Sequence, residues 1–491
     1  MQKSLILIIG LVCAFLSSFA QSADPRTGNW IGSIEGANMP IYFRIKGDSA
    51  SGYKADWNSP AQKALGLPCK TLIIMGDTLF IETSGVIASF RGRYLPGLDS
   101  VTGSWRQNGQ AFPLNLRKMH RPQTPHPPFP YRSDSVEYDN MDRTVHLAAT
   151  LTIPSSETSP SADAHSTARP SAGTPPIPGK KYPVVILITG SGQEDRDETL
   201  VEHKPFAIIA DYLTRRGLAV LRVDDRGTGK STGDLRNATT ADFADDVLTS
   251  IRYLSTRGDI DTTRIGLIGH SEGGLIAPIV YTRWPHLHYI IMLAGPGVPG
   301  RAILLRQQTD PLRKISQEVY TAYYPLIKEK MKIMEDNYGQ PDSVILSQVK
   351  ASYTKWKAGL SDNVALQLQV KNVTEGMYGF QVAGELKPWL RYFYHTDPAV
   401  FLRQVKCPVL ALDGSKDLQV DPVENIPLIE AALANGGNTH VTTHVFPGLN
   451  HLFQHSATGE FSEYALIEES FAPEALQMMG DWIGKIDKLV P

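Results

Sequence analysis

The sequence contains little cysteine and almost no excess charge of either sign. Its three cysteines, Cys13, Cys69 and Cys407, are too far apart for a zinc site and too few for a disulfide framework. The 48 basic residues are matched by 50 acidic ones, which gives a formal net charge of -2. Proteins that bind nucleic acid or anionic membrane surfaces normally carry a clustered basic excess, so we expect neither partner.

Sequence signatures of cofactor and metal binding are also absent. The segment Gly227–Ser231 resembles the end of a phosphate-binding loop, but Asp224 stands where that motif requires a glycine. No histidine pair has the spacing of a helical zinc motif, and no Gly-x-Gly-x-x-Gly motif opens a helix after the first predicted core strand. We therefore expect no cofactor and no metal ion.

Long apolar runs are lacking beyond the N-terminus. The run Leu5–Leu16 follows Lys3 and precedes small residues, which is the pattern of a cleaved secretory signal peptide over residues 1–23. The run is shorter than the roughly 20 residues that a membrane-spanning helix needs, which argues against the alternative of an uncleaved anchor. The sequence thus predicts an exported protein, periplasmic or secreted, without a membrane span after cleavage.

Residues 24–121 are predicted to form a β-rich domain. Short alternating apolar runs in this region are separated by Gly, Asp, Asn and Pro, a pattern typical of an antiparallel barrel or sandwich. Trp30, Trp57 and Trp105 could line a ligand groove. We expect them in the core instead, because aromatic side chains dominate the buried area of small domains.

Two segments of biased composition come next. Residues 122–133 are proline-dense, which predicts a stiff linker between two domains. Residues 154–181 are rich in Ser, Thr, Ala, Pro and Gly, and such a composition cannot bury enough apolar surface to offset its ordering entropy. This segment is predicted to be a disordered insert within the second domain.

Residues 134–491 are predicted to form an α/β domain. Continuous apolar runs alternate with amphipathic helices such as Phe206–Arg215 and Ala241–Ser255, the pattern of a doubly wound, mostly parallel sheet covered on both faces. Between residues 299 and 398 apolar residues recur at helical spacing, which predicts a helical cap over the carboxyl edge of the sheet. A helical excursion that packs elsewhere is the alternative. The predicted strands are 182–189, 218–223, 265–268, 290–294 and 409–412, with 441–446 as a more polar edge strand.

The strongest motif is GHSEGG at residues 269–274, between a predicted strand and a predicted helix. Glycines two residues either side of a serine allow the tight strand-to-helix turn that presents the hydroxyl at the edge of a sheet. A glycine-rich turn that only eases helix packing is the alternative. We predict that Ser271 is a nucleophile on an elbow formed with Gly269 and Gly273.

A serine nucleophile needs a base, and the base needs an acid to orient it. Asp417 lies on a loop beyond the fifth predicted core strand and is the predicted acid, with Asp421 and Asp413 as alternatives. His451 lies on a loop after the last predicted strand, where catalytic groups concentrate, and is the predicted base. His455 is the alternative base.

The negative charge that develops in acyl transfer needs backbone N–H donors. One predicted donor is the amide of Glu272, which follows the nucleophile, and the second is the amide of Ser191 or Gly192 on the loop after the first core strand. Charged residues occupy two strand-to-loop junctions, at 195–197 and 224–226. We expect these charges to pair and fix the loops rather than to take part in catalysis.

From Ser135 to its end the chain resembles α/β-hydrolases of the exported bacterial esterase and serine-aminopeptidase-like type, which are related to prolyl-oligopeptidase-like hydrolases. The order Ser, Asp, His along the chain is also that of α/β-hydrolases. The resemblance implies a triad of Ser271, Asp417 and His451, hydrolysis of carboxylic esters and no metal. The N-terminal region, with its short GNW and GSW motifs, is similar to β-rich domains found ahead of such hydrolases. The segments that carry the resemblance are 187–192, 195–197, 225–231, 269–274, 413–420 and 450–453.

The sequence therefore predicts a serine esterase that acts on small acyl esters through an acyl-enzyme. A serine peptidase or aminopeptidase with the same triad is an alternative, in which Glu272 or Glu194 would hold the amine of the substrate. A thioesterase is a further alternative. Outside enzymes, the alternative is a carbohydrate-binding or scaffold protein with an inactive hydrolase fold. The sequence carries no signal for acyl-chain length or oligomeric state.

Overall fold

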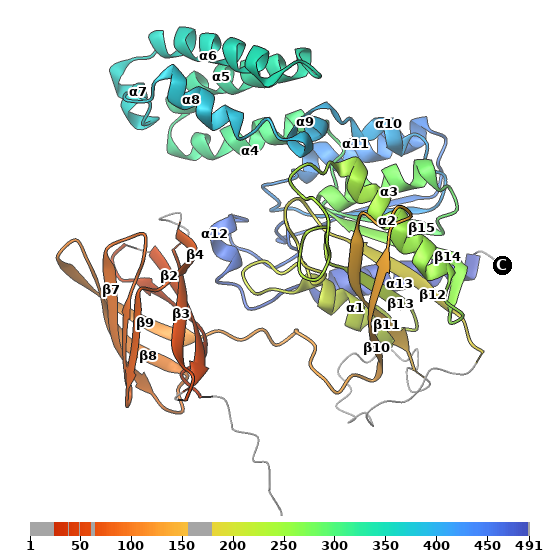
Figure 1. The fold of residues 1–491 in the computed structure, drawn as a ribbon, viewed down its shortest axis with the longest axis horizontal. Coiled ribbons are helices and arrows are strands. Elements are labelled where there is room, and N and C mark those ends of the chain that lie inside the picture. Colours follow the sequence, from red (N-terminus) through yellow and green to blue (C-terminus); the bar gives the residue numbers. More distant parts are fainter. Residues whose placement is uncertain (1–23, 38, 49, 60–63, 156–178, 490–491) are drawn as a thin grey trace, which may run out of the picture. The chain divides into compact units, whose positions relative to one another are not determined.

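The computed structural model describes residues 24–37, 39–48, 50–59, 64–155 and 179–489. The predicted signal peptide and most of the predicted insert lie outside the described residues. The chain divides into two compact units, one ending at His120 and the other beginning at Arg121 (Figure 1). No helix in the described ranges is long and apolar enough to cross a bilayer.

The first unit is a single curled antiparallel sheet (Figure 1). The strand order is β4-β3-β2-β1-β9-β8-β7-β6-β5, so the pairing of β1 with β9 joins two runs of consecutive strands. This arrangement fits the barrel-like form of the prediction and not the sandwich. The strands are β1 (Gly28–Ile34), β2 (Met39–Asp48), β3 (Gly52–Ser59), β4 (Ala64–Pro68), β5 (Thr71–Met75), β6 (Thr78–Glu82), β7 (Ala88–Leu95), β8 (Ser100–Gln107) and β9 (Gln110–Lys118).

The inward-facing side chains of this sheet form a core of their own. On β7, Phe90 and Tyr94 are buried and alternate with exposed arginines, because successive side chains of a strand point to opposite faces. The side chains of Trp30, Trp57 and Trp105 are fully buried in the same core. The prediction that the three tryptophans belong to the core is confirmed.

The second unit contains an eight-stranded sheet in the order β10-β11-β13-β12-β14-β15-β16-β17. The strands β10 and β11 are antiparallel additions, whereas the strands from β13 to β17 pair in parallel. The predicted doubly wound, mostly parallel sheet is confirmed, and β17 lies at its edge as predicted. The strands are β10 (Tyr131–Asp139), β11 (His146–Pro154), β12 (Tyr182–Ile188), β13 (Ala219–Val223), β14 (Ile260–His270), β15 (Tyr289–Leu293), β16 (Val409–Gly414) and β17 (Val441–Phe446).

Helices cover both faces of this sheet. On β12, Val184 and Ile186 pack into one core with α2 and α3, whereas Val185 and Leu187 pack into the opposite core with α1 and α13. Burial on both faces explains why the strand is a continuous apolar run instead of an alternating one. The helices outside the cap are α1 (Pro205–Arg215), α2 (Thr240–Ser255), α3 (Glu272–Arg283), α10 (Pro398–Leu402), α11 (Pro422–Asn435), α12 (Phe461–Tyr464) and α13 (Pro473–Leu489).

The residues predicted as a linker, 122–133, belong to the second compact unit. The strand β10 already begins at Tyr131, whose hydroxyl donates to Asp211 of α1 at 2.8 Å. Upstream, the side chains of Arg121 and Gln123 each donate at 2.7 Å to a backbone carbonyl in the loop before α13. This segment therefore packs within the second unit, because its polar side chains bind backbone groups that are distant in sequence and that composition does not reveal.

A block of helices lies between β15 and β16, within the interval predicted as a cap (Figure 1). Several of them share a separate core that includes Leu326, Ile327 and Val349. The last helix of the block, α9, contacts α2, which packs on the sheet. The helices are α4 (Gly300–Ile315), α5 (Gln317–Asp336), α6 (Asp342–Ala358), α7 (Asp362–Gln367), α8 (Glu375–Ala383) and α9 (Pro388–His395).

Candidate active site

Ser271 lies on a strained turn between β14 and α3. Its φ of 52° falls in the left-handed region, which residues other than glycine seldom adopt. A Cβ atom on Gly269 would lie 2.0 Å from the carbonyl oxygen of Gly273, and one on Gly273 would lie 2.2 Å from that of Ile188. Only glycine fits at either position, so the chain can fold back tightly and hold the serine at the edge of the sheet.

Asp417 and His451 lie together on the loops that follow β16 and β17. Nδ1 of His451 is 2.6 Å from Oδ2 of Asp417, and only 5% and 0% of the two side chains are exposed. The other oxygen of Asp417 accepts the amides of Gln419 at 2.7 Å and Val420 at 2.9 Å. Because the loop backbone fixes the carboxylate, the imidazole is held in one orientation with its Nδ1–H donated to Asp417.

The alternative acids and the alternative base have other partners. Asp421 caps α11 and forms an ion pair with Arg306. Asp413 is fully buried, and burial followed by the charge of Asp417 raises the pKa of this carboxyl well above its usual range. His455 is exposed and pairs with two glutamates. Of the three aspartates considered, it is Asp417 that contacts His451.

His270 connects the elbow to the loop of His451, and it is a site residue that the sequence prediction misses. Its Nε2 donates to the backbone oxygen of His451 at 2.9 Å, and its Nδ1 donates to Oε1 of Glu198 at 2.8 Å. Burial lowers the pKa of His270, but the charge and hydrogen bond of Glu198 outweigh burial and raise this pKa to about 9. A protonated imidazole donates from both nitrogens, which matches these two acceptors.

The loop after β12 lies against Ser271. The carboxylate of Glu198, which pairs with His270, also accepts the amide of Gly190 at 2.8 Å. A Cβ atom added to Gly190 would lie 3.2 Å from Cβ of Ser271. Ser191 and Gly192 follow directly. Glu272 is the first residue of α3, so its amide has no acceptor in a preceding helical turn. The backbone groups predicted as oxyanion donors thus belong to the two segments that meet at the serine.

The side chain of Glu272 is buried behind the elbow, with 2% of the residue exposed. Its carboxyl accepts the hydroxyl of Thr240 at 2.7 Å and Nε1 of Trp389 at 2.8 Å, and the hydroxyl of Ser191 also bonds to it. Burial raises the pKa of this carboxyl. Trp389 belongs to α9 and Thr240 begins α2, so Glu272 connects the block of helices to the start of α2.

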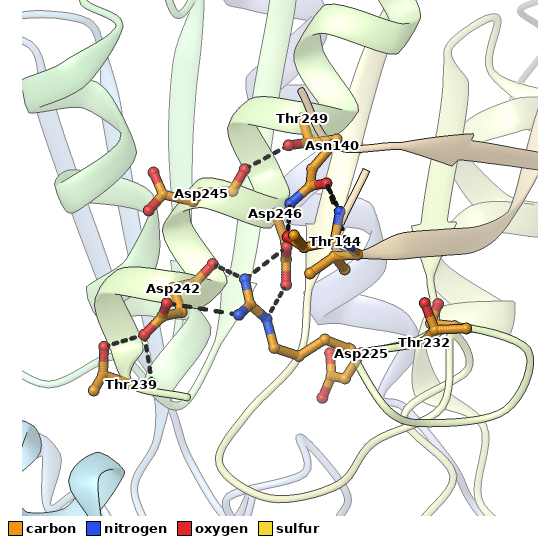
Figure 2. Close-up of polar contacts among 12 residues, drawn as sticks. Asn140, Thr144, Asp225, Thr232, Thr239, Asp242, Asp245, Asp246 and Thr249 are labelled. Carbon is orange, nitrogen blue, oxygen red and sulfur yellow. Dashed lines mark hydrogen bonds and ion pairs between the residues drawn. The ribbon is translucent and has the colours of Figure 1, made fainter. Parts of the chain in front are cut away.

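Most of the charged residues at the two strand-to-loop junctions form ion pairs, as the sequence predicts, whereas Asp195 accepts the backbone amides of Asp197 and Thr199. Arg196 donates to the two oxygens of Asp224 at 2.8 and 2.6 Å, which joins the two junctions directly. Arg226 donates to the two oxygens of Asp246 at 2.7 and 2.9 Å. Figure 2 shows this second cluster, in which Asp242 and Asp246 of α2 face the same guanidinium group. These ion pairs fix the loops near the site.

Asp225, labelled in the same view, departs from that prediction (Figure 2). Its carboxyl accepts the hydroxyl of Thr189 at 2.7 Å and the amide of Glu194 at 3.2 Å rather than a cation. Burial raises its pKa well above the usual range. The residue therefore joins the two loops through neutral hydrogen-bond donors.

No group of three or more His, Cys, Asp or Glu side chains among the described residues has an arrangement that could hold a metal ion. The chemistry available at the site is that of the elbow serine, the buried histidine and aspartate, and the surrounding backbone amides.

The strand order, the elbow after β14 and the loops after β16 and β17 define the second unit as an α/β-hydrolase fold. The family model described as "Serine aminopeptidase, S33" matches residues 202–350, which include the elbow.

Two curated proteins illustrate the similarity. The chain is 26% identical over 278 residues to "Esterase EstD" of Thermotoga maritima, an alignment that covers 55% of this chain and 54% of that protein. It is 25% identical over 158 residues to the "2-hydroxy-6-oxononadienedioate/2-hydroxy-6-oxononatrienedioate hydrolase" of Escherichia coli K12, covering 32% of this chain and 50% of that protein. The chain spans about half the length of these relatives. A solved puromycin-hydrolyzing peptidase of Mycobacterium tuberculosis is 15% identical with a TM-score of 0.42, covering 92% of this chain and 54% of that one.

Proposed function

We propose that this protein is a serine hydrolase that cleaves carboxylic esters through an acyl-enzyme on Ser271. The observation that carries the proposal is the buried pair of His451 and Asp417, joined at 2.6 Å beside the elbow. A serine hydroxyl becomes nucleophilic when a base accepts its proton and an acid orients that base. The hydrogen bond from His270 to the backbone of His451 keeps the elbow and the loop of the base adjacent.

The proposed reaction has two halves. His451 takes the proton of Ser271 Oγ as that oxygen attacks the ester carbonyl, and the amides of Glu272 and of Ser191 or Gly192 stabilise the oxyanion. The bond to the alcohol then breaks, and the imidazolium returns its proton to the departing alkoxide. Water, deprotonated by the same imidazole, attacks the acyl-enzyme, releases the carboxylic acid and restores the serine.

The state of two acidic residues favours esters over aminopeptidase substrates. An aminopeptidase needs an ionised carboxylate that can reach the ammonium group of its substrate. The oxygens of Glu272 are buried and already accept hydrogen bonds from Thr240 and Trp389. Burial raises the pKa of Glu194 to about 8, so that carboxyl carries little charge at neutral pH. Neither residue is suited to hold an amine.

The name of the Thermotoga maritima relative, an esterase, supports the same substrate class. The predicted signal peptide over residues 1–23 further supports the proposal that the protein works in the periplasm or outside the cell.

The test combines labelling with a substrate panel. A fluorophosphonate should label wild-type protein at Ser271, whereas Ser271→Ala should neither react nor turn over substrate, and Ser343→Ala on the exposed face of α6 should behave as wild type. Esters of 4-nitrophenol with graded acyl chains, set beside aminoacyl and peptidyl anilides, then separate esterase from peptidase. Faster cleavage of the anilides than of every ester would refute the ester assignment.

A further inference from the structure

A cavity of about 510 Å³ adjoins the loop after β12, a volume typical of sites for small molecules. Its lining comes from that loop, from the segment before α2, from α2 itself and from the segment that starts α9. The lining residues used below are Ser191, Leu235, Arg236, Phe243, Lys387 and Trp389.

Two contacts place this cavity next to the nucleophile. Ser191 and Trp389 both line it, and the side chains of both bond to the carboxyl of Glu272, the residue directly after Ser271. Ser191 also follows Gly190, whose added Cβ would lie 3.2 Å from Cβ of Ser271. A substrate whose carbonyl carbon is attacked by the serine can therefore extend into the cavity.

Part of the lining is apolar and aromatic. Phe243 of α2, Trp389 of α9 and Leu235 supply large hydrophobic surfaces. Ring faces of this kind favour a flat or apolar group over a strongly hydrated one.

The same cavity is lined by two cations that form no ion pair with a carboxylate of the described residues. In the part of the chain that the structure describes, no ion pair involves the guanidinium of Arg236 or the ammonium of Lys387, in contrast to Arg226 with its partners on α2. The nearby Asp234 accepts the amide of Arg236 and Nδ2 of Asn237, and its charge interacts with that of Arg236 without forming an ion pair. Glu194, close to Gly192 of the lining, adds little opposing charge because burial raises its pKa to about 8. Unpaired cations beside an apolar cavity attract an anion.

We infer that the preferred esters of this enzyme carry an anionic group, a carboxylate first of all, on an aromatic or other apolar part that occupies this cavity. Arg236 and Lys387 select for the charge, and Phe243 and Trp389 receive the apolar part. The inference rests on the proposed ester hydrolysis and names its substrate class.

The test compares esters of matched shape and different charge. One arm places the charge on the leaving group, with 4-acetoxybenzoate, the neutral 4-acetoxybenzamide and the cationic 4-acetoxybenzylammonium. The other arm places it on the acyl chain, with mono(4-nitrophenyl) glutarate against 4-nitrophenyl pentanoate. In at least one arm, Arg236→Gln or Lys387→Gln should lower the anionic-to-neutral ratio of kcat/KM about 2- to 5-fold, and the double variant about 10-fold. Comparing ratios between enzymes cancels the intrinsic reactivities of the esters.

Salt and a distant lysine serve as controls. Raising the NaCl concentration to about 0.5 M should lower the same ratio in wild type, because the cations are exposed. Lys355→Gln, at an exposed position of α6 outside the cavity lining, should leave the ratio unchanged. Calorimetric binding of 4-hydroxybenzoate against 4-hydroxybenzamide gives a readout that needs no turnover.

The outcomes separate the two proposals. A ratio that the double variant leaves unchanged in both arms would overturn the charge selection while ester hydrolysis stands. Failure of wild type to cleave any ester, neutral ones included, would instead refute the proposed function.

Discussion

The loops after the parallel strands form one side of the site, the sheet side, and the helical block forms the other, the cap side. The two sides differ in what holds their functional groups in place. On the sheet side, loops after parallel strands are fixed by backbone hydrogen bonds and by glycines that no other residue can replace, as at Gly269 and Gly273. On the cap side, Trp389 of α9 and Lys387, the residue before that helix, present side chains to the cavity. In the proposed function, reactivity therefore depends on positions where the backbone cannot change, and selectivity depends on side chains that can change at little cost.

The largest effect is expected on the sheet side. Ser271→Ala should lower kcat by about 10⁶-fold, because removing the nucleophile of a serine hydrolase leaves only the contributions of binding and of the oxyanion donors. Steady-state kinetics with a 4-nitrophenyl ester measure the loss, and circular dichroism shows that the fold is retained. Since the sheet side acts on every ester alike, a loss confined to some esters would break the comparison.

The next effect concerns the acid. Asp417→Asn should lower kcat by about 10⁴-fold, because an amide at this position stabilises the wrong tautomer of His451. Asp421→Asn is the matched control and should cost little, since asparagine also caps a helix. If the control were the more damaging of the two, the assignment of Asp417 would be wrong.

The sheet side was largely predictable from sequence because it depends on local pattern. Continuous apolar runs marked β12, β13, β15 and β16 to within two residues at either end, and turn residues marked the loops that hold Asp417 and His451. The start of β14 was not predictable, since its polar residues at 261–264 interrupt the apolar pattern while the strand continues.

Tertiary pairings were beyond the sequence. His270 and Glu198 are 72 positions apart, and nothing in either segment indicates that one carboxylate serves both the histidine and the amide of Gly190. The same holds for the bond of Trp389 to Glu272, which brings α9 to the elbow across 117 positions. The contacts of Arg121 and Gln123 with the loop before α13 likewise join residues 346 and 348 positions apart.

A third prediction uses the pH dependence of the link between His270 and Glu198. The pKa of His270 is raised to about 9 in the folded protein from an ordinary value near 6.5. A histidine with a raised pKa stabilises the fold fully at pH values below its pKa in the unfolded state. This stabilisation is lost as the pH rises through its pKa in the folded state. The free energy of unfolding should therefore fall between about pH 6.5 and pH 9, by on the order of 1 to 3 kcal/mol.

Urea titrations across this pH range measure the effect. Glu198→Gln removes the charge that raises the pKa of His270, so the variant should be less stable near pH 7 and should show a smaller decline between about pH 6.5 and pH 9. The rest of the decline comes from Glu194, whose pKa of about 8 acts in the same direction. A decline of equal size in the variant would show that other groups cause it.

The smallest effect is expected at the cap. Trp389→Phe keeps an aromatic ring, a phenyl in place of the indole, but removes the Nε1–H that donates to Glu272. Stability should therefore fall by about 1 to 2 kcal/mol, and the relative rates of different esters should change by less than 10-fold. Trp356→Phe removes a comparable bond, to the carbonyl of Ala322, inside the cap core. Kinetics on the ester panel should show altered ranking with the first variant only, and an equal change with both would contradict a selective role for α9.

The measurement that tests the central claim most directly is detection of the acyl-enzyme itself. Wild-type protein mixed with a slowly deacylated aryl ester and quenched in acid should gain the mass of one acyl group, and peptide mapping should place it on the segment that contains Ser271. Asp417→Asn should acylate at the same site far more slowly. Rapid ester turnover without any acyl adduct, or an adduct on a different residue, would contradict the account.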